Sequence, residues 1–314
     1  MSKNAVISID IGGTNTKIGI VDFDGTIINQ TVISTTDYPD INIFVDTVIN
    51  EISLLNKGNK NILKGIGIGA PNGNIYSGSI EFAPNLIWKG IIPLAKMFTE
   101  KTKLLSVLTN DANAAAIGEM KFGAAKNIKN FIFITLGTGV GSGIVVDGKL
   151  VYGHDGLAGE IGHVIVFPDG RECGCGRKGC LEMYASVRGI CITMKELMQK
   201  YNQPKLLPLN FNSKDIFLLA EKGNKIAIEA FKITGEILGL AIANSVAYTS
   251  PSDIFMFGGL AHAWEFLYPS TIDSFNNNLL KIYKNKIEIK KSELKDSDAA
   301  ILGGAAIIID KLSE

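Results

Sequence analysis

This chain carries one local pattern twice, as Ile11-Gly-Gly-Thr-Asn-Thr-Lys-Ile-Gly-Ile-Val-Asp-Phe-Asp-Gly25 and as Leu136-Gly-Thr-Gly-Val-Gly-Ser-Gly-Ile-Val-Val-Asp-Gly148. Each copy predicts a strand end, a turn rich in glycine and threonine, a second strand and an Asp-Gly turn. The repeat indicates two related halves, each presenting a glycine-rich hairpin towards the same gap. A nucleotide in that gap would have its phosphates held from both sides.

Strands and helices alternate around the two hairpins. Apolar runs predict strands at residues 5–11, 17–21, 26–34, 65–69, 107–109 and 253–257. Helical patterns are expected at residues 41–55, 187–201, 214–221, 225–248 and about 297–312, with further helices beginning at Asp111 and near His262. This order favours an α/β fold with mixed sheets. At 314 residues the chain exceeds the usual size of one core, so we expect two domains around a cleft.

Composition argues against several classes of function. Lys+Arg and Asp+Glu both number 31, so the chain has no basic excess with which to bind nucleic acid. Met1 to Asn4 lead straight into an apolar run of seven residues, which is too short for a signal peptide. The longest apolar stretch, Ile237 to Tyr248, is too short to span a bilayer. We therefore expect a cytoplasmic protein without nucleic-acid or membrane partners.

A cysteine-rich stretch, Cys173-Gly-Cys-Gly-Arg-Lys-Gly-Cys-Leu-Glu182, begins ten residues after His163. Three cysteines and one histidine form a standard ligand set for a closed zinc site, which predicts structural Zn²⁺. The predicted ligands are His163, Cys173, Cys175 and Cys180. The alternative is three free cysteines in a reducing cytosol, with His163 buried in the core.

Other residues near this stretch extend the interpretation. Cys191 lies in an apolar stretch and is expected to be a small buried residue rather than a ligand. Glu160 and Glu182 lie within a few residues of the predicted ligands. One metal ion would therefore hold two carboxylates in fixed positions, as a floor for a polyhydroxylated ligand.

The glycine-rich hairpins themselves suggest phosphate binding. Glycine accepts unusual backbone angles and has no Cβ, so the N–H groups of such a turn can converge on phosphate oxygens. Neither hairpin matches a P-loop or a GxGxxG motif, and either one alone reads as a plain turn. Asp10 stands at the end of the first strand, where Mg²⁺ held by phosphates would need an oxygen ligand, and its alternative role is to cap the turn.

Asn110 and Asp111 follow an apolar strand and precede an alanine-rich helix. Strand ends of this kind open into ligand crevices in α/β sheets. Asp111 could be a helix N-cap. In a phosphoryl transferase, an aspartate at this place would accept the proton of the attacking hydroxyl and orient that hydroxyl towards the γ-phosphate.

With these motifs, the sequence resembles the ROK group of bacterial sugar kinases and sugar-responsive repressors, within the actin/hexokinase superfamily. The resemblance runs from Asp10 to the final helix. Six motifs carry it in order: residues 10–17, Pro84-Asn85, Asn110-Asp111, residues 136–143, Gly159-Glu-Ile-Gly-His163 and residues 173–182. The resemblance implies two actin-like (ribonuclease H-like) domains with a cleft between them. The small domain would comprise residues 1–112, completed by a helix at about 297–314, and the large domain, residues 113–296, would carry the zinc site.

The resemblance also implies roles for residues at matching positions. Asp111 would be the catalytic base. Hexose hydroxyls would be bound by Asn85, Asn110, Glu160, His163 and Glu182. ATP and Mg²⁺ would be bound by Asp10, Gly12, Gly13, Thr14, Thr16, Lys17, Gly137, Thr138, Gly139, Gly258 and Gly259, with the last two lying against adenosine. His163 would bind zinc through one ring nitrogen and a sugar hydroxyl through the other.

The expected reaction is transfer of the ATP γ-phosphate to O6 of a hexose, with glucose first. Alternative substrates are N-acetylmannosamine, N-acetylglucosamine and fructose. A repressor would need a DNA-binding segment before the first phosphate motif, where this sequence has nine residues, so a sugar sensor without such a segment is the non-enzymatic alternative. An actin-like ATPase would have no use for the acids around a zinc site. By analogy with the family, we expect a homodimer formed through the helices after the zinc region.

Overall fold

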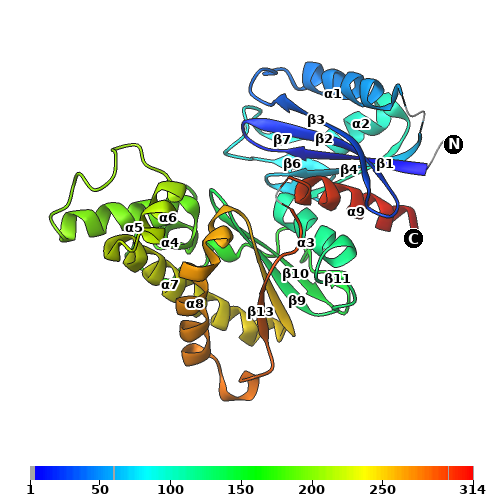
Figure 1. The fold of residues 1–314 in the computed structure, drawn as a ribbon. Helices are drawn as coiled ribbons and strands as arrows, with labels where there is room; N and C mark the ends of the chain where they lie inside the picture. The colour runs from blue at the N-terminus through cyan, green and yellow to red at the C-terminus, as the bar shows by residue number, and fades with distance from the viewer. Residues whose placement is uncertain (1–3, 59–60, 296, 314) are drawn as a thin grey trace. The chain divides into compact units, whose positions relative to one another are not determined.

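The computed structural model describes residues 4–58, 61–295 and 297–313, which fall into two compact units (Figure 1). Unit 1 comprises Met1–Lys129, Gly143–Gly159 and Ser292–Glu314, and unit 2 comprises Asn130–Ser142 and Glu160–Lys291. Residues 1–3, 59–60 and 314 of the predicted small domain, and residue 296 of the predicted large domain, lie outside the described residues.

A five-stranded sheet forms the centre of unit 1. Its order is β3 (Ile27–Ser34), β2 (Asn15–Asp22), β1 (Asn4–Ile11), β4 (Ile62–Ala70) and β8 (Leu105–Asn110). The first three strands pair antiparallel, whereas β4 pairs parallel with both β1 and β8. The predicted α/β fold with a mixed sheet is therefore confirmed.

Alternation along β1 explains how helices cover both faces of this sheet. Ile7, Ile9 and Ile11 belong to the core cluster that includes residues of α1 (Ile41–Asn56) and α2 (Leu94–Thr102). Val6 instead packs with α9 (Ala299–Ser313). Successive side chains of a strand point to opposite faces, so α1 and α2 cover one face and α9 the other (Figure 1). On this pattern Asp10 shares the face of Val6.

Helix α3 (Asp111–Phe122) packs closely against α9 through small residues. A Cβ added at Gly303 would lie 2.7 Å from the backbone of Ala114, and one added at Gly118 would lie 3.0 Å from the Cα of Gly303. This contact explains why residues 113–129 fall in unit 1. The predicted domain limits at residues 112 and 296 stay a prediction.

Unit 2 contains a larger set of helices and most of a second sheet, whose residues 143–150 belong to unit 1. The order of the sheet is β11 (Lys149–Leu150), β10 (Val140–Val146), β9 (Phe131–Leu136), β12 (Asp253–Phe257) and β13 (Glu288–Lys291), with β12 parallel to β9 and β13. The helices of this unit are α4 (Glu182–Ala185), α5 (Val187–Lys200), α6 (Ser213–Glu221), α7 (Lys225–Thr249) and α8 (Trp264–Asn278), with short 3-10 turns at Ile161–His163, Gly259–Ala263 and Lys281–Tyr283. Their apolar faces form one large core with β9 and β12.

The predicted strands and helices are all present, with bounds shifted by up to three residues. The helix expected near His262 begins at Trp264, after the 3-10 turn. Short elements were not predicted: α2, strand β13 and a small sheet of β5 (Gly73–Asn74), β6 (Ser79–Glu81) and β7 (Ile91–Ile92). Strands of two or three residues are too short to show a period.

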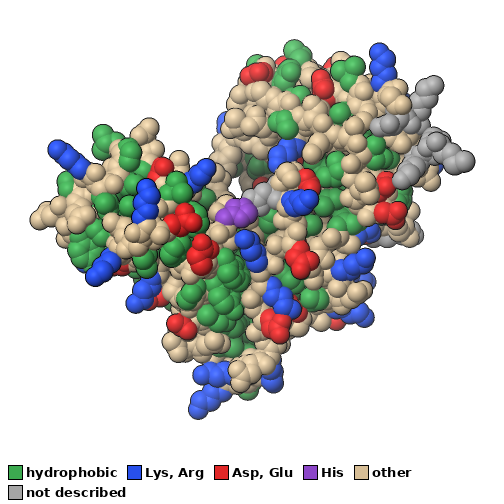
Figure 2. All heavy atoms as spheres, viewed as in Figure 1, with side chains coloured by type: hydrophobic (Ala, Val, Ile, Leu, Met, Phe, Trp, Pro, Cys, Tyr) green, Lys and Arg blue, Asp and Glu red, His purple; other side chains and the backbone are tan. Residues whose placement is uncertain are grey.

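The surface agrees with the balanced composition. On the face shown in Figure 2, lysine and arginine side chains are mixed with aspartate and glutamate. Within residues 4–58, 61–295 and 297–313, no helix has both the length and the apolar character needed to cross a bilayer.

Candidate active site

The first glycine-rich turn joins β1 to β2 and is held by backbone contacts. The Gly12 N–H donates to the Asn15 carbonyl at 2.9 Å, which closes the turn. A Cβ on Gly13 would lie 2.6 Å from the Asn85 carbonyl oxygen, so glycine lets the Asn85 loop pack against the turn. The side chains of Thr14 and Asn85 are exposed. The structure thus brings the first predicted phosphate turn next to a predicted sugar-binding residue.

Two further residues of the predicted phosphate motif lie on β2. Thr16 is fully buried, and its hydroxyl lies 2.8 Å from that of Thr35. Because this side chain is used inside the protein, a contact of Thr16 with phosphate would have to come from its backbone. Lys17 is the cross-strand partner of Asp10 in the antiparallel pair.

Asp10 and Asp111 lie on either side of Gly69. Asp10 and Gly69 are register partners in the parallel pair of β1 and β4. A Cβ added at Gly69 would lie 3.7 Å from Asp10 Oδ1 and 3.8 Å from the Asp111 Cα. The two acids therefore share the edge where the carboxyl ends of β1, β4 and β8 meet, which is where α/β sheets bind ligands.

Both acids have raised pKa values. Desolvation raises the pKa of Asp10 to about 6, the charge of Asp111 adds to this rise, and Lys17 opposes it. Solvent contacts the Asp111 side chain, yet the protein atoms around it desolvate its charged form and raise its pKa. Paired carboxylates with shifted pKa values are candidates for proton transfer.

The start of α3 separates the roles of Asn110 and Asp111. Asn110 has extended backbone angles, and its Oδ1 accepts the Ala112 N–H at 2.9 Å. Asp111 is the first helical residue, and its Oδ1 accepts the same N–H at 2.8 Å. The alternative that Asp111 is the N-cap is therefore wrong, because Asn110 occupies that position.

The second glycine-rich turn, in unit 2, joins β9 to β10. The Gly137 N–H donates to the Gly139 carbonyl at 3.0 Å, and the Gly137 carbonyl accepts the Val187 N–H at 2.8 Å. A Cβ on Gly139 would lie 2.8 Å from Glu182 Oε2. Thr138, between the two glycines, is exposed. This turn therefore lies against the starts of α4 and α5.

The predicted adenosine turn lies beside this second turn. Gly258 has a φ of +100°, a backbone conformation that favours glycine, and a Cβ there would lie 2.8 Å from the Leu136 carbonyl. A Cβ on Gly259 would lie 3.8 Å from the side chain of Val187. The structure thus groups Gly137 to Gly139 with Gly258 and Gly259 in one unit.

The four predicted zinc ligands form one cluster. The candidate ligand atoms of His163, Cys173, Cys175 and Cys180 all lie within 4.8 Å of one another. Cys175 Sγ lies 3.6 Å from Cys180 Sγ, and Cys173 Sγ lies 3.8 Å from His163 Nδ1. A tetrahedron with Zn–S bonds of about 2.3 Å and Zn–N bonds of about 2.0 Å has edges of about 3.6–3.8 Å. The donor set and its spacing therefore fit zinc.

The surroundings act on the cluster thiols in opposite directions, because burial raises the pKa values of Cys173 and Cys180. The Arg177 backbone N–H lowers the pKa of the Cys175 thiol, which favours the thiolate that zinc binds. The Arg177 side chain donates to the His163 carbonyl at 2.9 Å. Gly179 has a φ of +73°, and a Cβ there would lie 1.6 Å from the Phe167 carbonyl, so only glycine fits this turn of the loop.

The predicted sugar-binding acids of unit 2 lie next to this cluster. His163 directs Nδ1 to Cys173, and its Nε2 lies 3.9 Å from Glu160 Oε2. The Cys173 thiol donates to Glu182 Oε1 at 3.0 Å, and His163 Nδ1 lies 3.9 Å from the same oxygen. The structure therefore brings together Glu160, His163 and Glu182, as the sequence interpretation requires.

Sequence reasoning missed the role of Gly69. Its signal was the alternation Gly65-Ile-Gly67-Ile-Gly69, since glycine inside a strand marks close approach of another backbone. A Cβ on Gly67 would lie 1.8 Å from the Gly304 carbonyl of α9. The glycine face of β4 thus admits α9 at one end and the two acids at the other.

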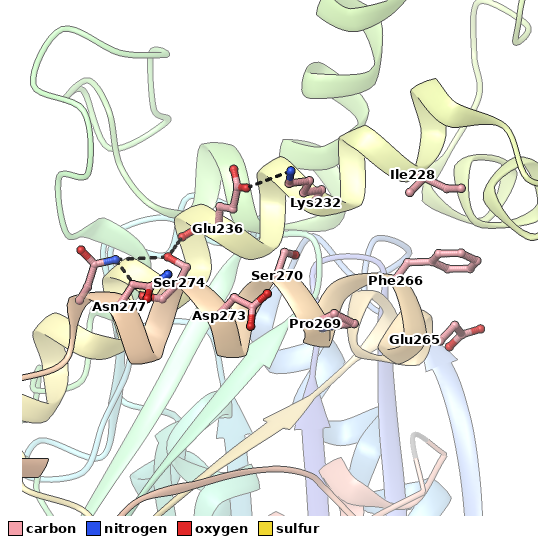
Figure 3. Close-up of a pocket in the computed structure, with 11 residues that line it drawn as sticks. Ile228, Lys232, Glu236, Glu265, Phe266, Pro269, Ser270, Asp273, Ser274 and Asn277 are labelled. Carbon is pink, nitrogen blue, oxygen red and sulfur yellow. Dashed lines mark hydrogen bonds and ion pairs between the residues drawn. The ribbon is translucent and has the colours of Figure 1, made fainter. Parts of the chain in front are cut away.

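A separate groove of about 600 Å³ lies between α7 and α8 (Figure 3). It contains none of the predicted site residues. Its lining includes a Lys232–Glu236 ion pair at 3.8 Å and the hydrogen bond from Ser274 Oγ to the Glu236 carbonyl at 2.6 Å.

Comparisons with known proteins agree with the motif resemblance. The model of the ROK family matches residues 6–311. A glucokinase of Halalkalibacterium halodurans is 33% identical over 98% of this chain and 96% of its own length. A crystal structure of a ROK family glucokinase from Streptomyces griseus in complex with glucose and AMPPNP is 31% identical, with a TM-score of 0.81 over 96% of this chain and 98% of that chain. A xylose repressor of Caldicellulosiruptor bescii is 29% identical over 98% of this chain and 79% of its own length.

Proposed function

Because this chain belongs to the ROK family, we propose that it is an ATP-dependent hexose kinase that phosphorylates O6, with glucose as the preferred sugar. The observation that carries the proposal is the pair Asp10 and Asp111, two acids of raised pKa at one sheet edge beside a glycine-rich turn. The named glucokinase relatives and the related glucose and AMPPNP complex support the same reaction.

In this proposal Asp111 accepts the proton of the attacking sugar hydroxyl and orients that hydroxyl towards the γ-phosphorus. A raised pKa makes this carboxylate a stronger base than an ordinary aspartate. Asn110 supports it by capping α3. Most of the rate enhancement then comes from the positioning of the two substrates.

The remaining groups bind rather than react. N–H groups of the turns at residues 12–14 and 137–139 would hold phosphates, and Gly258-Gly259 would lie against adenosine. Bound Mg²⁺ would neutralise phosphate charge, with Asp10 as the residue that holds it. Asn85, Asn110, Glu160, His163 and Glu182 would bind the sugar hydroxyls. A structural zinc ion would be held by the four-residue cluster.

An assay of ADP release coupled to a visible signal tests this proposal. The purified chain would be given ATP, Mg²⁺ and in turn glucose, N-acetylmannosamine, N-acetylglucosamine and fructose. We expect turnover, with the highest kcat/KM for glucose. A higher kcat/KM for N-acetylmannosamine would replace the sugar but keep the reaction, whereas no turnover with any of the four would refute the kinase.

A second candidate is a sugar sensor, which the similarity to a xylose repressor favours. Calorimetry would detect sugar binding by such a protein, and the coupled assay would detect no release of ADP.

We further propose a cytoplasmic homodimer that associates through the helices after the cysteine cluster. A mass equal to that of one chain, measured by light scattering, would contradict the dimer.

A further inference from the structure

Arg171 reaches from the cysteine loop to the junction of α4 and α5, both in unit 2. Its guanidinium donates to the carbonyls of Met183 at 2.7 Å and Gly189 at 3.2 Å. It also donates to Thr193 Oγ1 at 3.0 Å and to both carboxylate oxygens of Glu196, at 3.1 and 2.5 Å. Only 15% of the Arg171 side chain is exposed. All three nitrogens of the guanidinium therefore donate hydrogen bonds, unlike those of a solvated surface charge.

The contact with Met183 supplies a hydrogen bond that the helix lacks. In a continuous helix, the Val187 N–H would donate to the Met183 carbonyl. Here it donates to the Gly137 carbonyl at 2.8 Å, because the chain bends at Ser186 between α4 and α5. The Met183 carbonyl therefore has no partner within the helix, and a cation is a favoured partner for a carbonyl at the C-terminal end of a helix.

The ring of Tyr184 completes this contact. The guanidinium carbon of Arg171 lies 4.5 Å from the ring centroid, and the Arg171 backbone N–H donates to the Tyr184 hydroxyl at 2.8 Å. Met183 and Tyr184 directly follow Glu182, the first residue of α4. Arg171 thus holds the short turn of helix that carries a predicted sugar-binding carboxylate.

The other contact of the cysteine loop with Glu182 is of a different kind. It runs from the Cys173 thiol to Glu182 Oε1 at 3.0 Å. Zinc binds cysteine as thiolate, so a bound ion would take the place of the proton that makes this bond. The contacts of Arg171 use no metal ligand, and they hold α4 in either case.

We propose that Arg171 is a positioning residue that fixes Glu182 for sugar binding through α4, separately from the metal cluster. The inference rests on the proposed kinase only for the identity of the ligand. Arg171 makes its side-chain contacts with α4 and α5 and none with residues 137–139 or 258–259, so its loss should affect the sugar more than ATP.

Arg171→Lys tests the proposal, with Arg188→Lys on the exposed side of α5 as its matched control. Lysine keeps the charge but loses the planar fork, so it cannot make all of these bonds. In zinc-loaded protein we expect the KM for sugar to rise about 10-fold or more, with kcat, the KM for ATP and the zinc content near wild type. An unchanged KM for sugar, or a rise accompanied by loss of zinc, would overturn it.

Hydrogen exchange gives a test that does not depend on turnover. The segment containing residues 181–189 should exchange faster in Arg171→Lys than in wild type, and should be unchanged in Arg188→Lys. Equal protection in all three proteins would refute the role of Arg171 even if the protein is a kinase. Conversely, if the wild-type protein phosphorylates no hexose, the proposed kinase activity is refuted. The exchange result would still decide whether Arg171 holds α4.

Glu196→Gln is the second variant, in case Arg171→Lys does not fold. It removes the charged partner of the guanidinium from an exposed side chain and leaves the helix contacts in place. We expect changes in the KM for sugar and in exchange that have the same direction and are smaller. Wild-type values of both quantities in this variant would count against the proposal.

Discussion

The two glycine-rich turns share a local sequence but differ in what packs against them. At Gly13 the space left by the missing side chain is filled by a backbone oxygen of Asn85. At Gly139 the same kind of space is filled by a side-chain oxygen of Glu182. A backbone oxygen can move only with its loop, whereas a carboxylate can rotate away.

The turns also differ in where their acid comes from. The strand before the first turn supplies its own acid, Asp10, whose pKa is raised by burial and by Asp111. The strand before the second turn ends in Thr135 and Leu136, and its acid, Glu182, comes from a helix 43 residues later in the chain. A repeated turn therefore sets a backbone shape, and its neighbours decide the chemistry.

The largest effect is expected from Asp111→Asn, which changes the surroundings of the first turn and not those of the second. The amide cannot accept the proton, so we expect kcat to fall about 10²- to 10⁴-fold with sugar binding retained. Asp24→Asn, at an exposed acid in the β2–β3 turn, is the control and should leave kcat unchanged. Steady-state kinetics measure kcat, and calorimetry measures sugar binding. A near-normal kcat in Asp111→Asn would show that Asp111 is not the catalytic base.

Cys175→Ser should affect the surroundings of the second turn and leave those of the first turn unchanged. We expect bound zinc to fall from about one atom per chain to near zero and thermal stability to fall with it, since zinc binding energy is folding energy. The KM for sugar should rise while nucleotide binding changes little. Elemental analysis and thermal unfolding measure this, with Cys191→Ser as the thiol control outside the cluster. Equal zinc in both variants would contradict the assignment.

Gly13→Ala should destabilise unit 1. The added methyl meets a backbone oxygen at 2.6 Å, so the Asn85 loop must shift, and we expect a loss of about 1–3 kcal/mol in the free energy of unfolding. Denaturant unfolding measures this loss. A variant as stable as wild type would show that the loop yields as easily as a side chain.

Gly139→Ala should change binding more than stability. Its methyl would displace the Glu182 carboxylate, so we expect the KM for sugar to rise about 10-fold, equivalent to about 1.4 kcal/mol, with unfolding little changed. Gly137→Ala is the steric control, because a Cβ there meets no atom within 4 Å. The contrast between the turns would be lost if Gly139→Ala reduced stability as much as Gly13→Ala.

A further prediction concerns Asp10 and pH. Its pKa rises from 3.8 to about 6 on folding, so between about pH 4 and pH 6 the folded state holds more protons than the unfolded state. This contribution to stability is present at low pH and is lost as pH rises through 6. Asp10→Asn should therefore show a smaller decrease in unfolding free energy across this range than wild type. Parallel profiles for the two proteins would contradict the raised pKa.

Much of the fold followed from local patterns. Apolar runs located β1 and β12, which are buried along most of their length, and helical patterns located α1, α5 and α7. The small sheet of β5 to β7 escaped, since two or three residues show no period. Helix α2 is only nine residues long and has no side-chain cap at Pro93, so it lacked a start signal.

The sequence by itself located the two glycine-rich turns, the cysteine and histidine cluster and the acids at strand ends, because each is a local pattern of residue types and spacings. Only the tertiary structure decided that Gly69 separates Asp10 from Asp111, that Thr16 is used internally by Thr35, and that Arg171 holds the helix of Glu182. The physical reason is that these contacts join segments that meet only when strands pair and helices pack. The spacing of residues along the chain does not show which distant segments will come into contact.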